Sequence, residues 1–251
     1  MRTALLRRRR RGPSLPADLV ALLEQDPDVL AYPSVELETL YQDPAATVLA
    51  GPGDPCGGMR DPVTREIVAT QPTDSQRMIV GADGRSLEAD GVSQNLIIDY
   101  DPGPDFTGND SAGTMIMRVA RGTKTGSQCL IGAASSTAIF GVFIRTDPER
   151  IELQGRADGP GVRVVGPEAF EGTDMRVVGL RTDGSYDLLI DGSMAASGAI
   201  LGGSANSIST PFRIGCRSSS SGSPEFFAEA TFGPLAIYGR ALSDAVIASL
   251  S

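Results

Sequence analysis

The fold of this chain is decided by residues 175–199, which read MRVVGLRTDGSYDLLIDGSMAASGA. Two turn dipeptides, Asp183-Gly184 and Asp191-Gly192, separate three runs of strand-forming residues at 175–182, 185–190 and 193–198. An Asp-Gly pair between such runs is a strong signal for a tight β-hairpin. This stretch therefore predicts a three-stranded antiparallel meander.

Strand signals continue on both sides of the meander. Short runs bounded by Gly, Pro or Asp lie at 114–120, 129–132, 139–145, 150–156, 212–217 and 229–238. In one of them, Ile151 and Leu153 alternate with Glu152 and Gln154, as expected for a strand with one buried face. Because no long helical pattern separates these runs, the sequence predicts an all-β fold, an antiparallel two-sheet jelly-roll sandwich.

Short helices are predicted at the two ends of the chain. Near the N-terminus, Pro16 suits a first helical turn, the leucines at 15, 19, 22 and 23 share one face, and Asp26-Pro27 ends the helix. Near the C-terminus, Ser243 is suited to cap a last helix with apolar residues at 246, 247 and 250.

Several of these segments resemble laminin-G-like, concanavalin A-like sandwiches. The matching stretches are the opening strand at 86–98, the hairpin at 177–192, the strand at 212–215, and the ending Ile-Tyr-Gly-Arg-Ala-Leu-Ser-Asp-Ala at 237–245. The ending is the most specific of them, although Gly239 and Val246 depart from the usual pattern. The resemblance implies a structural or adhesive domain of the concanavalin A-like fold.

The preceding segment resembles a second family feature. Leu40-Tyr41-Gln42-Asp43, Gly53-Asp54-Pro55 and Ala69-Thr70-Gln71-Pro72 are similar to a stretch that precedes this sandwich in virion proteins of tailed phages and gene transfer agents. Together these patterns predict three parts: residues 1–35 as a basic arm and short helix that anchor the chain, residues 36–84 as an extended wrap with short strands, and residues 85–251 as the sandwich. The short helix docks either on the sandwich or, with the arm, on a partner.

Charge is distributed unevenly along the chain. The chain has 22 basic and 31 acidic residues, a net charge of −9. Arg2 and the run Arg7, Arg8, Arg9, Arg10 and Arg11 account for six of the basic residues, so residues 12–251 hold 16 basic against 31 acidic residues, a net −15. Such an acidic body does not suit nucleic-acid binding. The arginine run is either an anchor that binds an acidic surface of other virion proteins or a solvated tail.

Cysteines and targeting signals indicate where the protein is made. Cys56, Cys129 and Cys216 are an odd and widely spaced set, which predicts free buried thiols in a reducing cytoplasm. We predict no secretory signal and no membrane span, because no apolar stretch is long enough. A virion component assembled in the host cytoplasm fits these features.

An enzymatic role is not expected. A glucanase on this fold needs paired carboxylates alternating along a strand face, and the sequence has no Glu-x-Asp-x-Glu run and no histidine. Asp99 and Asp101 are two residues apart, but Pro102 and Pro104 place them at a strand end or in a loop. We therefore predict that the protein is not an enzyme and has no organic cofactor.

Glycan binding is compatible with the sequence, which has 13 aromatic residues and no Trp. The phenylalanines lie in strand patterns and are expected in the core, whereas Tyr32, Tyr41 and Tyr100 are better placed for exposure. Tyr100 and Asp101 are the candidate glycan-binding residues. The same loop has Asp99, Asp101, Asp105 and Asp110, which are oxygen ligands of the kind calcium binds. A solvated, turn-forming cluster is the alternative explanation for these carboxylates.

Two functions follow from these patterns and the resemblance. The first is a non-enzymatic virion structural protein, a head or tail fibre, spike or decoration, whose lectin-like sandwich attaches to host surface glycans; as a fibre-like component it would be a homo-oligomer. The second is a free carbohydrate-binding, lectin-like module that is not attached to a particle.

Overall fold

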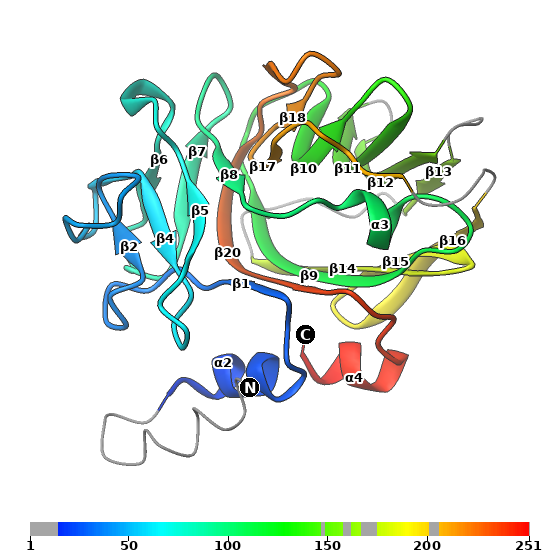
Figure 1. Ribbon diagram of the computed structural model, residues 1–251, viewed down its shortest axis with the longest axis horizontal. Helices are drawn as coiled ribbons and strands as arrows, with labels where there is room; N and C mark the ends of the chain where they lie inside the picture. Colours follow the sequence, from blue (N-terminus) through cyan, green and yellow to red (C-terminus); the bar gives the residue numbers. More distant parts are fainter. Residues whose placement is uncertain (1–14, 147–148, 158–161, 167–174, 201–205, 251) are drawn as a thin grey trace.

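A computed structural model describes residues 15–146, 149–157, 162–166, 175–200 and 206–250. Within these residues the chain forms two antiparallel sheets packed face to face (Figure 1). The predicted two-sheet β-sandwich is therefore confirmed. No helix in the described residues is long and apolar enough to cross a membrane.

The nine-stranded sheet contains the predicted meander. Its order is β16 (Ser193–Ala199), β15 (Ser185–Ile190), β14 (Arg176–Asp183), β9 (Ala112–Arg121), β20 (Glu229–Tyr238), β7 (Leu87–Asp90), β6 (Met78–Val80) and β3 (Pro55–Cys56), with β1 (Val29–Ala31) paired to β20. The first turn of the meander differs from the expected two-residue form. Thr182 pairs with Tyr186, so three residues form that turn. Asp191 and Gly192 form the second turn, and their positive φ angles of 48° and 75° suit a two-residue hairpin.

The eleven-stranded sheet forms the other layer. Its order is β13 (Val162–Val165), β12 (Glu149–Ala157), β11 (Ala138–Thr146), β10 (Gln128–Ala134), β17 (Phe212–Ile214), β8 (Leu96–Ile98), β5 (Ile67–Thr70), β4 (Gly58–Arg60) and β2 (Leu40–Tyr41). The short strands β18 (Arg217–Ser218) and β19 (Pro224–Glu225) attach beside β10. The described helices are α2 (Ala17–Glu24), α3 (Gly103–Phe106), α4 (Asp244–Ser249) and the 3-10 turn η1 (Asp74–Gln76).

Alternation along the strands separates two hydrophobic clusters. In β15, Tyr186 and Leu188 point into the core between the sheets, whereas Leu189 points to the outer face of the nine-stranded sheet. There Leu189 packs in a second cluster with Leu23 of α2 and Ile247 of α4. Figure 1 shows both helices lying below this sheet. The predicted terminal helices are thus confirmed, and they cover a sheet face.

Residues 36–84, for which we expected an extended wrap with short strands, contribute short strands to both sheets. Their strands β3 and β6 extend the nine-stranded sheet, and β2, β4 and β5 extend the eleven-stranded sheet. Leu40, Met59 and Met78 belong to the same hydrophobic core as the later strands. These strands are only two to four residues long, which is too short for a period-two pattern to show in the sequence.

From residue 15 onward, the segment 1–35 packs against the sandwich, which is one of the two arrangements that the sequence left open. Leu19 and Leu23 are fully buried, and β1 pairs with β20. Tyr32 was expected to be exposed, but it is buried and donates a hydrogen bond to Asp18. Burial and the neighbouring Asp18 carboxylate raise the pKa of Tyr32 to about 12. The exposure predicted for Tyr41 is also wrong, since its side chain is buried.

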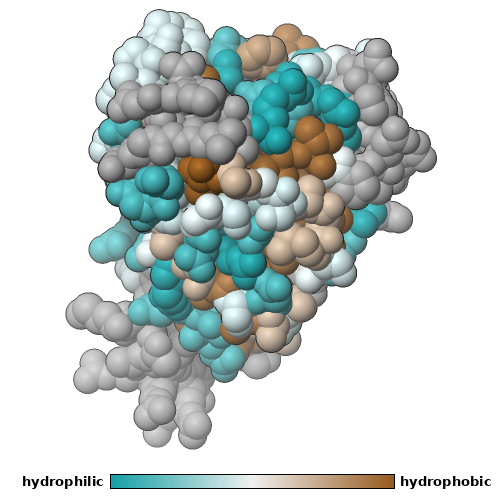
Figure 2. Space-filling view, turned by 90° about the vertical axis from the view of Figure 1, so that its right-hand side faces the viewer, coloured by the Kyte–Doolittle hydropathy of each residue, from teal (hydrophilic) through white to brown (hydrophobic). Residues whose placement is uncertain are grey.

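The three cysteines are free and buried, as predicted. Among the phenylalanines the prediction holds for most, with Phe106, Phe140, Phe212 and Phe232 in the core between the sheets. Among the other described phenylalanines, Phe143 is buried outside this core, Phe227 is half-buried and Phe226 is 40% exposed. On the side of the molecule shown in Figure 2, hydrophobic residues are interspersed with hydrophilic ones, which is usual for a protein surface.

Candidate functional site

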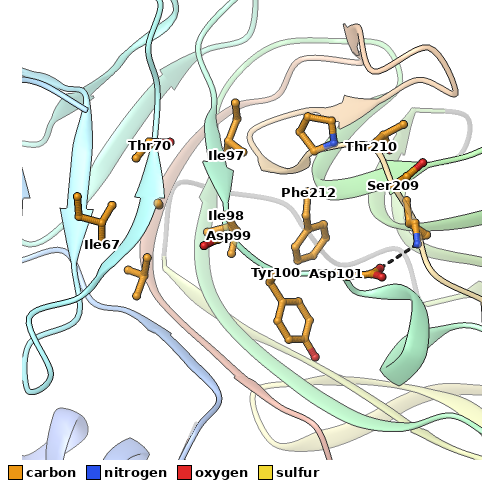
Figure 3. A pocket seen from close by; sticks show the side chains of 14 residues that line it. Ile67, Thr70, Ile97, Ile98, Asp99, Tyr100, Asp101, Ser209, Thr210 and Phe212 are labelled. Carbon is orange, nitrogen blue, oxygen red and sulfur yellow. Dashed lines mark hydrogen bonds between the residues drawn. The ribbon is translucent and has the colours of Figure 1, made fainter. Parts of the chain in front are cut away.

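An open groove of about 690 Å³ lies where three distant segments meet. Strand pairing brings them together, because Ile98 of β8 pairs with Ala69 of β5 on one side and with Phe212 of β17 on the other. The chain that continues from β8 through Tyr100 and Asp101 closes one end (Figure 3). The segment 208–211, which leads into β17, forms the opposite wall.

The groove has an apolar floor and a polar rim. Ile67 and Ile97 supply apolar surface, and the ring of Tyr100 packs against that of the buried Phe212 with centroids 6.3 Å apart. Hydroxyl groups of Thr70, Ser209 and Thr210 and the exposed carboxylate of Asp99 lie around them (Figure 3). Among the described residues that line the groove, none is Lys or Arg.

Asp101 shapes the groove by joining two of its walls. Its Oδ1 accepts hydrogen bonds from the backbone N–H of Gly103, at 2.9 Å, and of Ile208, also at 2.9 Å. The first bond fixes the start of α3, and the second ties the segment 208–211 to the end of β8 (Figure 3). Asp101, which the sequence suggested as a glycan-binding residue, lines this groove, and its described contacts are with the backbone.

Tyr100 stands at the acidic end of the groove. Its hydroxyl donates a hydrogen bond to the Asp105 carboxylate. Burial, the bond to Asp105 and the nearby carboxylate charges raise the pKa of Tyr100 above its ordinary value. Burial also raises the pKa of Asp105, and the charges of Asp28 and Asp101 add to this effect, although the Tyr100 hydrogen bond opposes it. The phenol is therefore a neutral hydrogen-bonding group at physiological pH.

The structure does not assemble the predicted calcium ligands. The described residues contain no group of three or more Asp, Glu or Cys side chains that could hold a metal ion. Asp101 is directed at two backbone amides, and Asp105 is directed at Tyr100. Asp99 and Asp110 therefore do not join them in one ligand set. The arginines Arg7, Arg8, Arg9, Arg10 and Arg11 lie outside the described residues.

Sequence reasoning missed most of the groove. Ile67, Thr70, Ile97 and Ser209 lie in segments that are up to 142 positions apart, and nothing local marks them as neighbours. The sequence did contain one signal for the groove, the alternation in β8. Leu96 and Ile98 face the core, whereas Ile97 points to the opposite face. Tyr100 lies two residues after the end of this strand, in the loop that the sequence indicated as exposed.

The comparisons with known proteins agree with this architecture. No family model matches the chain, and no curated protein matches it. Among solved structures, it is similar to the Trypanosoma rangeli sialidase in complex with 2,3-difluorosialic acid, with 15% identity, a TM-score of 0.56, and coverage of 88% of this chain and 32% of that one. It is also similar to a mutant of the NanB sialidase from Streptococcus pneumoniae, with 16% identity, a TM-score of 0.53, and coverage of 66% and 27%.

A third similar structure is a toxin domain. The ligand binding domain of botulinum neurotoxin serotype D, in complex with N-acetylneuraminic acid, is 11% identical with a TM-score of 0.52, and the match covers 74% of this chain and 48% of that one. The chain has a lectin-like β-sandwich fold. At these identities the likeness establishes the fold alone, and the chain spans less than half the length of each of these three structures.

Proposed function

We propose that this chain is a non-catalytic carbohydrate-binding module and that its groove binds a sugar. The observation that carries the proposal is the composition of the groove. An apolar floor of Ile67 and Ile97 lies beside hydroxyls and the Asp99 carboxylate. Sugars present both an apolar C–H face and a ring of hydroxyls, so they match a surface of this kind. Similar sandwiches are found in a sialidase and in a toxin binding domain that holds N-acetylneuraminic acid.

The charge of the groove favours a neutral sugar. Asp99 and Asp101 line it, Asp105 lies beside it, and none of its described lining residues is basic. Carboxylates accept hydrogen bonds from sugar hydroxyls but repel a carboxylated sugar. We therefore propose a neutral hexose or a polymer of neutral hexoses as the ligand, in contrast to the acidic sugar held by the toxin domain.

The positions of the Asp99 and Asp101 carboxylates argue against hydrolysis of a bound sugar. A glycosidase needs one carboxylic acid to protonate the leaving oxygen and a second carboxylate opposite it. Asp101 is bonded to the backbone amides of Gly103 and Ile208, and so it holds the loop in place. Asp99 is left as an exposed hydrogen-bond acceptor at the rim.

Asp99→Asn is expected to weaken binding of a neutral oligosaccharide about tenfold, because a hydrogen bond to a charged acceptor contributes about 1.5–3 kcal/mol. The ligand would be chosen on an array of neutral and sialylated glycans, and its affinity measured by isothermal titration calorimetry. Asp183→Asn is the matched control, since this exposed carboxylate lies at the end of β14 and does not line the groove. Equal affinity of Asp99→Asn and Asp183→Asn would contradict the proposal. Selective binding of sialylated glycans by both Asp99→Asn and the unchanged chain would also contradict it.

We further propose that the module is a component of a virion, assembled in the host cytoplasm. The resemblance of residues 40–72 to a stretch of tailed-phage virion proteins supports this setting, as does the arginine run that precedes α2. Helix α2 packs on the outer face of the nine-stranded sheet, whereas strands of the eleven-stranded sheet form the groove. An arm that precedes α2 and a bound glycan can therefore be engaged at the same time.

Deleting residues 1–12 is expected to abolish incorporation into particles, because it removes all six N-terminal arginines and leaves the buried leucines of α2 in place. The measurement is the amount of the chain that co-sediments with purified particles, compared with the full chain. Undiminished incorporation of the shortened chain would show that the arm does not attach it.

A further inference from the structure

The outer face of β11, β12 and β13 carries a cluster of arginines on an otherwise acidic chain. Strands β11 to β13 lie at the upper right of Figure 1. Val142, Ile151 and Val164 of these strands face the core. The residues that alternate with them therefore point outward, and among these are Phe143 and Arg145 of β11, Arg150 and Glu152 of β12, and Arg163 of β13.

Glu152 is the centre of this outer face. Its side chain is fully buried, and its Oε1 accepts hydrogen bonds from Gln154 Nε2 at 2.7 Å and from Arg145 Nη2 at 3.2 Å. Arg163 pairs with its second oxygen. Burial opposes ionisation of Glu152, but the bonds from Arg163 and Gln154 and the charges of both arginines hold its pKa below the ordinary value. The carboxylate therefore stays charged and fixes the two guanidinium groups in position.

The third arginine of this face is Arg150. Arg150 lies directly opposite Arg145 in the β11–β12 register, and like charges directly opposite each other destabilise a sheet. Its Nε is buried and has no hydrogen-bond partner in the described part of the chain. The face carries three arginines, Arg145, Arg150 and Arg163, and one acidic residue, Glu152, which leaves two positive charges in excess among its described residues. A bound anion would give the buried Nε–H an acceptor and would neutralise part of the excess positive charge.

Aromatic side chains border the arginines. The guanidinium carbon of Arg145 lies 4.6 Å from the centre of the Phe143 ring, and Arg217 lies 5.1 Å from the centre of Phe226. Phe226 has a positive φ of 57°, which is an unfavourable conformation for a bulky residue, and 40% of it is exposed. Strained and exposed aromatic residues of this kind occur at ligand-binding positions.

We infer that this face is a second binding site, specific for a carboxylated sugar unit of an acidic polysaccharide. The sugar carboxylate would accept two parallel hydrogen bonds from the guanidinium group of Arg150, beside Arg145 and Arg163. Arginine binds carboxylates in this bidentate geometry. The exposed ring of Phe226 would offer an apolar surface to the adjacent part of the chain of sugars. This site goes beyond the proposed function, because its charge preference is opposite to that of the groove and none of its residues lines the groove.

The test uses the full-length chain with Arg2 and Arg7 to Arg11 replaced by Gln, so that the arm cannot bind a polyanion. Binding to immobilised polygalacturonate is compared with binding to the same polymer after methyl esterification, which removes the carboxylate charge and keeps the sugar. We expect binding to the acid form and its loss on the ester. Within this background, Arg150→Gln is expected to weaken binding about tenfold. Arg163→Gln, at an exposed position, is a second variant expected to weaken binding.

Arg85→Gln is the matched control. It removes the same charge from an arginine that is 53% exposed and pairs with Glu36, far along the chain from this face. Equal binding by Arg150→Gln and Arg85→Gln, equal binding to the acid and ester polymers, or loss of all binding when only the arm is changed would each overturn the inference. Because the groove is tested with neutral sugars and Asp99→Asn, either proposal can fail without the other.

Discussion

The Gly155→Ala variant is expected to lose about 3 kcal/mol of unfolding free energy, as an overpacked core does. Gly155 of β12 lies against Tyr186 of β15, a strand of the opposite sheet, and a Cβ at this position would overlap the phenol ring. Tyr186 cannot easily withdraw, because it is buried and its hydroxyl donates a hydrogen bond to the carbonyl of Phe106 at 2.8 Å. Urea unfolding followed by circular dichroism measures the loss.

The explanation can be checked with a second change. If the clash with the ring causes the loss, Tyr186→Leu in the Gly155→Ala background should restore part of the stability that Gly155→Ala removes, although Tyr186→Leu alone destabilises the protein. If the stability losses of the two single variants simply add in the double variant, Gly155→Ala destabilises the protein by another route, for example through the backbone of β12.

Leu23→Ala is expected to lower the free energy of unfolding by about 3 kcal/mol. Truncation of a fully buried leucine removes apolar contacts and leaves a cavity. Leu23 is 0% exposed and lies with Ile116 and Val177 in the cluster on the outer face of the nine-stranded sheet. Its loss should therefore destabilise the sandwich as a whole and not only α2. The midpoint and slope of urea unfolding provide the measurement.

The control for this prediction lies on the same helix. Glu24 is exposed next to Leu23, so Glu24→Ala should change the stability by less than about 0.5 kcal/mol. If Leu23→Ala were as stable as Glu24→Ala, helix α2 would not be docked on the sheet. The segment 15–31 would then belong with the arm, which is the other arrangement that the sequence left open.

The sequence by itself determined the parts of this fold that local signals encode. Asp191-Gly192 fixes a hairpin because glycine and aspartate tolerate positive φ at adjacent positions. The alternation of Ile151 and Leu153 with Glu152 and Gln154 identified which face of β12 is buried, because successive side chains on a strand point to opposite sides. The leucine pattern of α2 and the position of Ser243 before α4 were likewise sufficient to place both terminal helices.

Only the tertiary structure decided which of these surfaces meet. The groove joins β5, β8 and the segment before β17, and the pairing of Ile98 with both Ala69 and Phe212 is a contact across 29 and 114 positions. Likewise, Glu152 was expected to face solvent because it faces away from the core, yet its side chain is fully buried and pairs with Arg145 and Arg163. Pattern and propensity report the conformation of neighbouring residues. They contain no information on which distant strands share an edge, because that choice depends on the packing of the whole core.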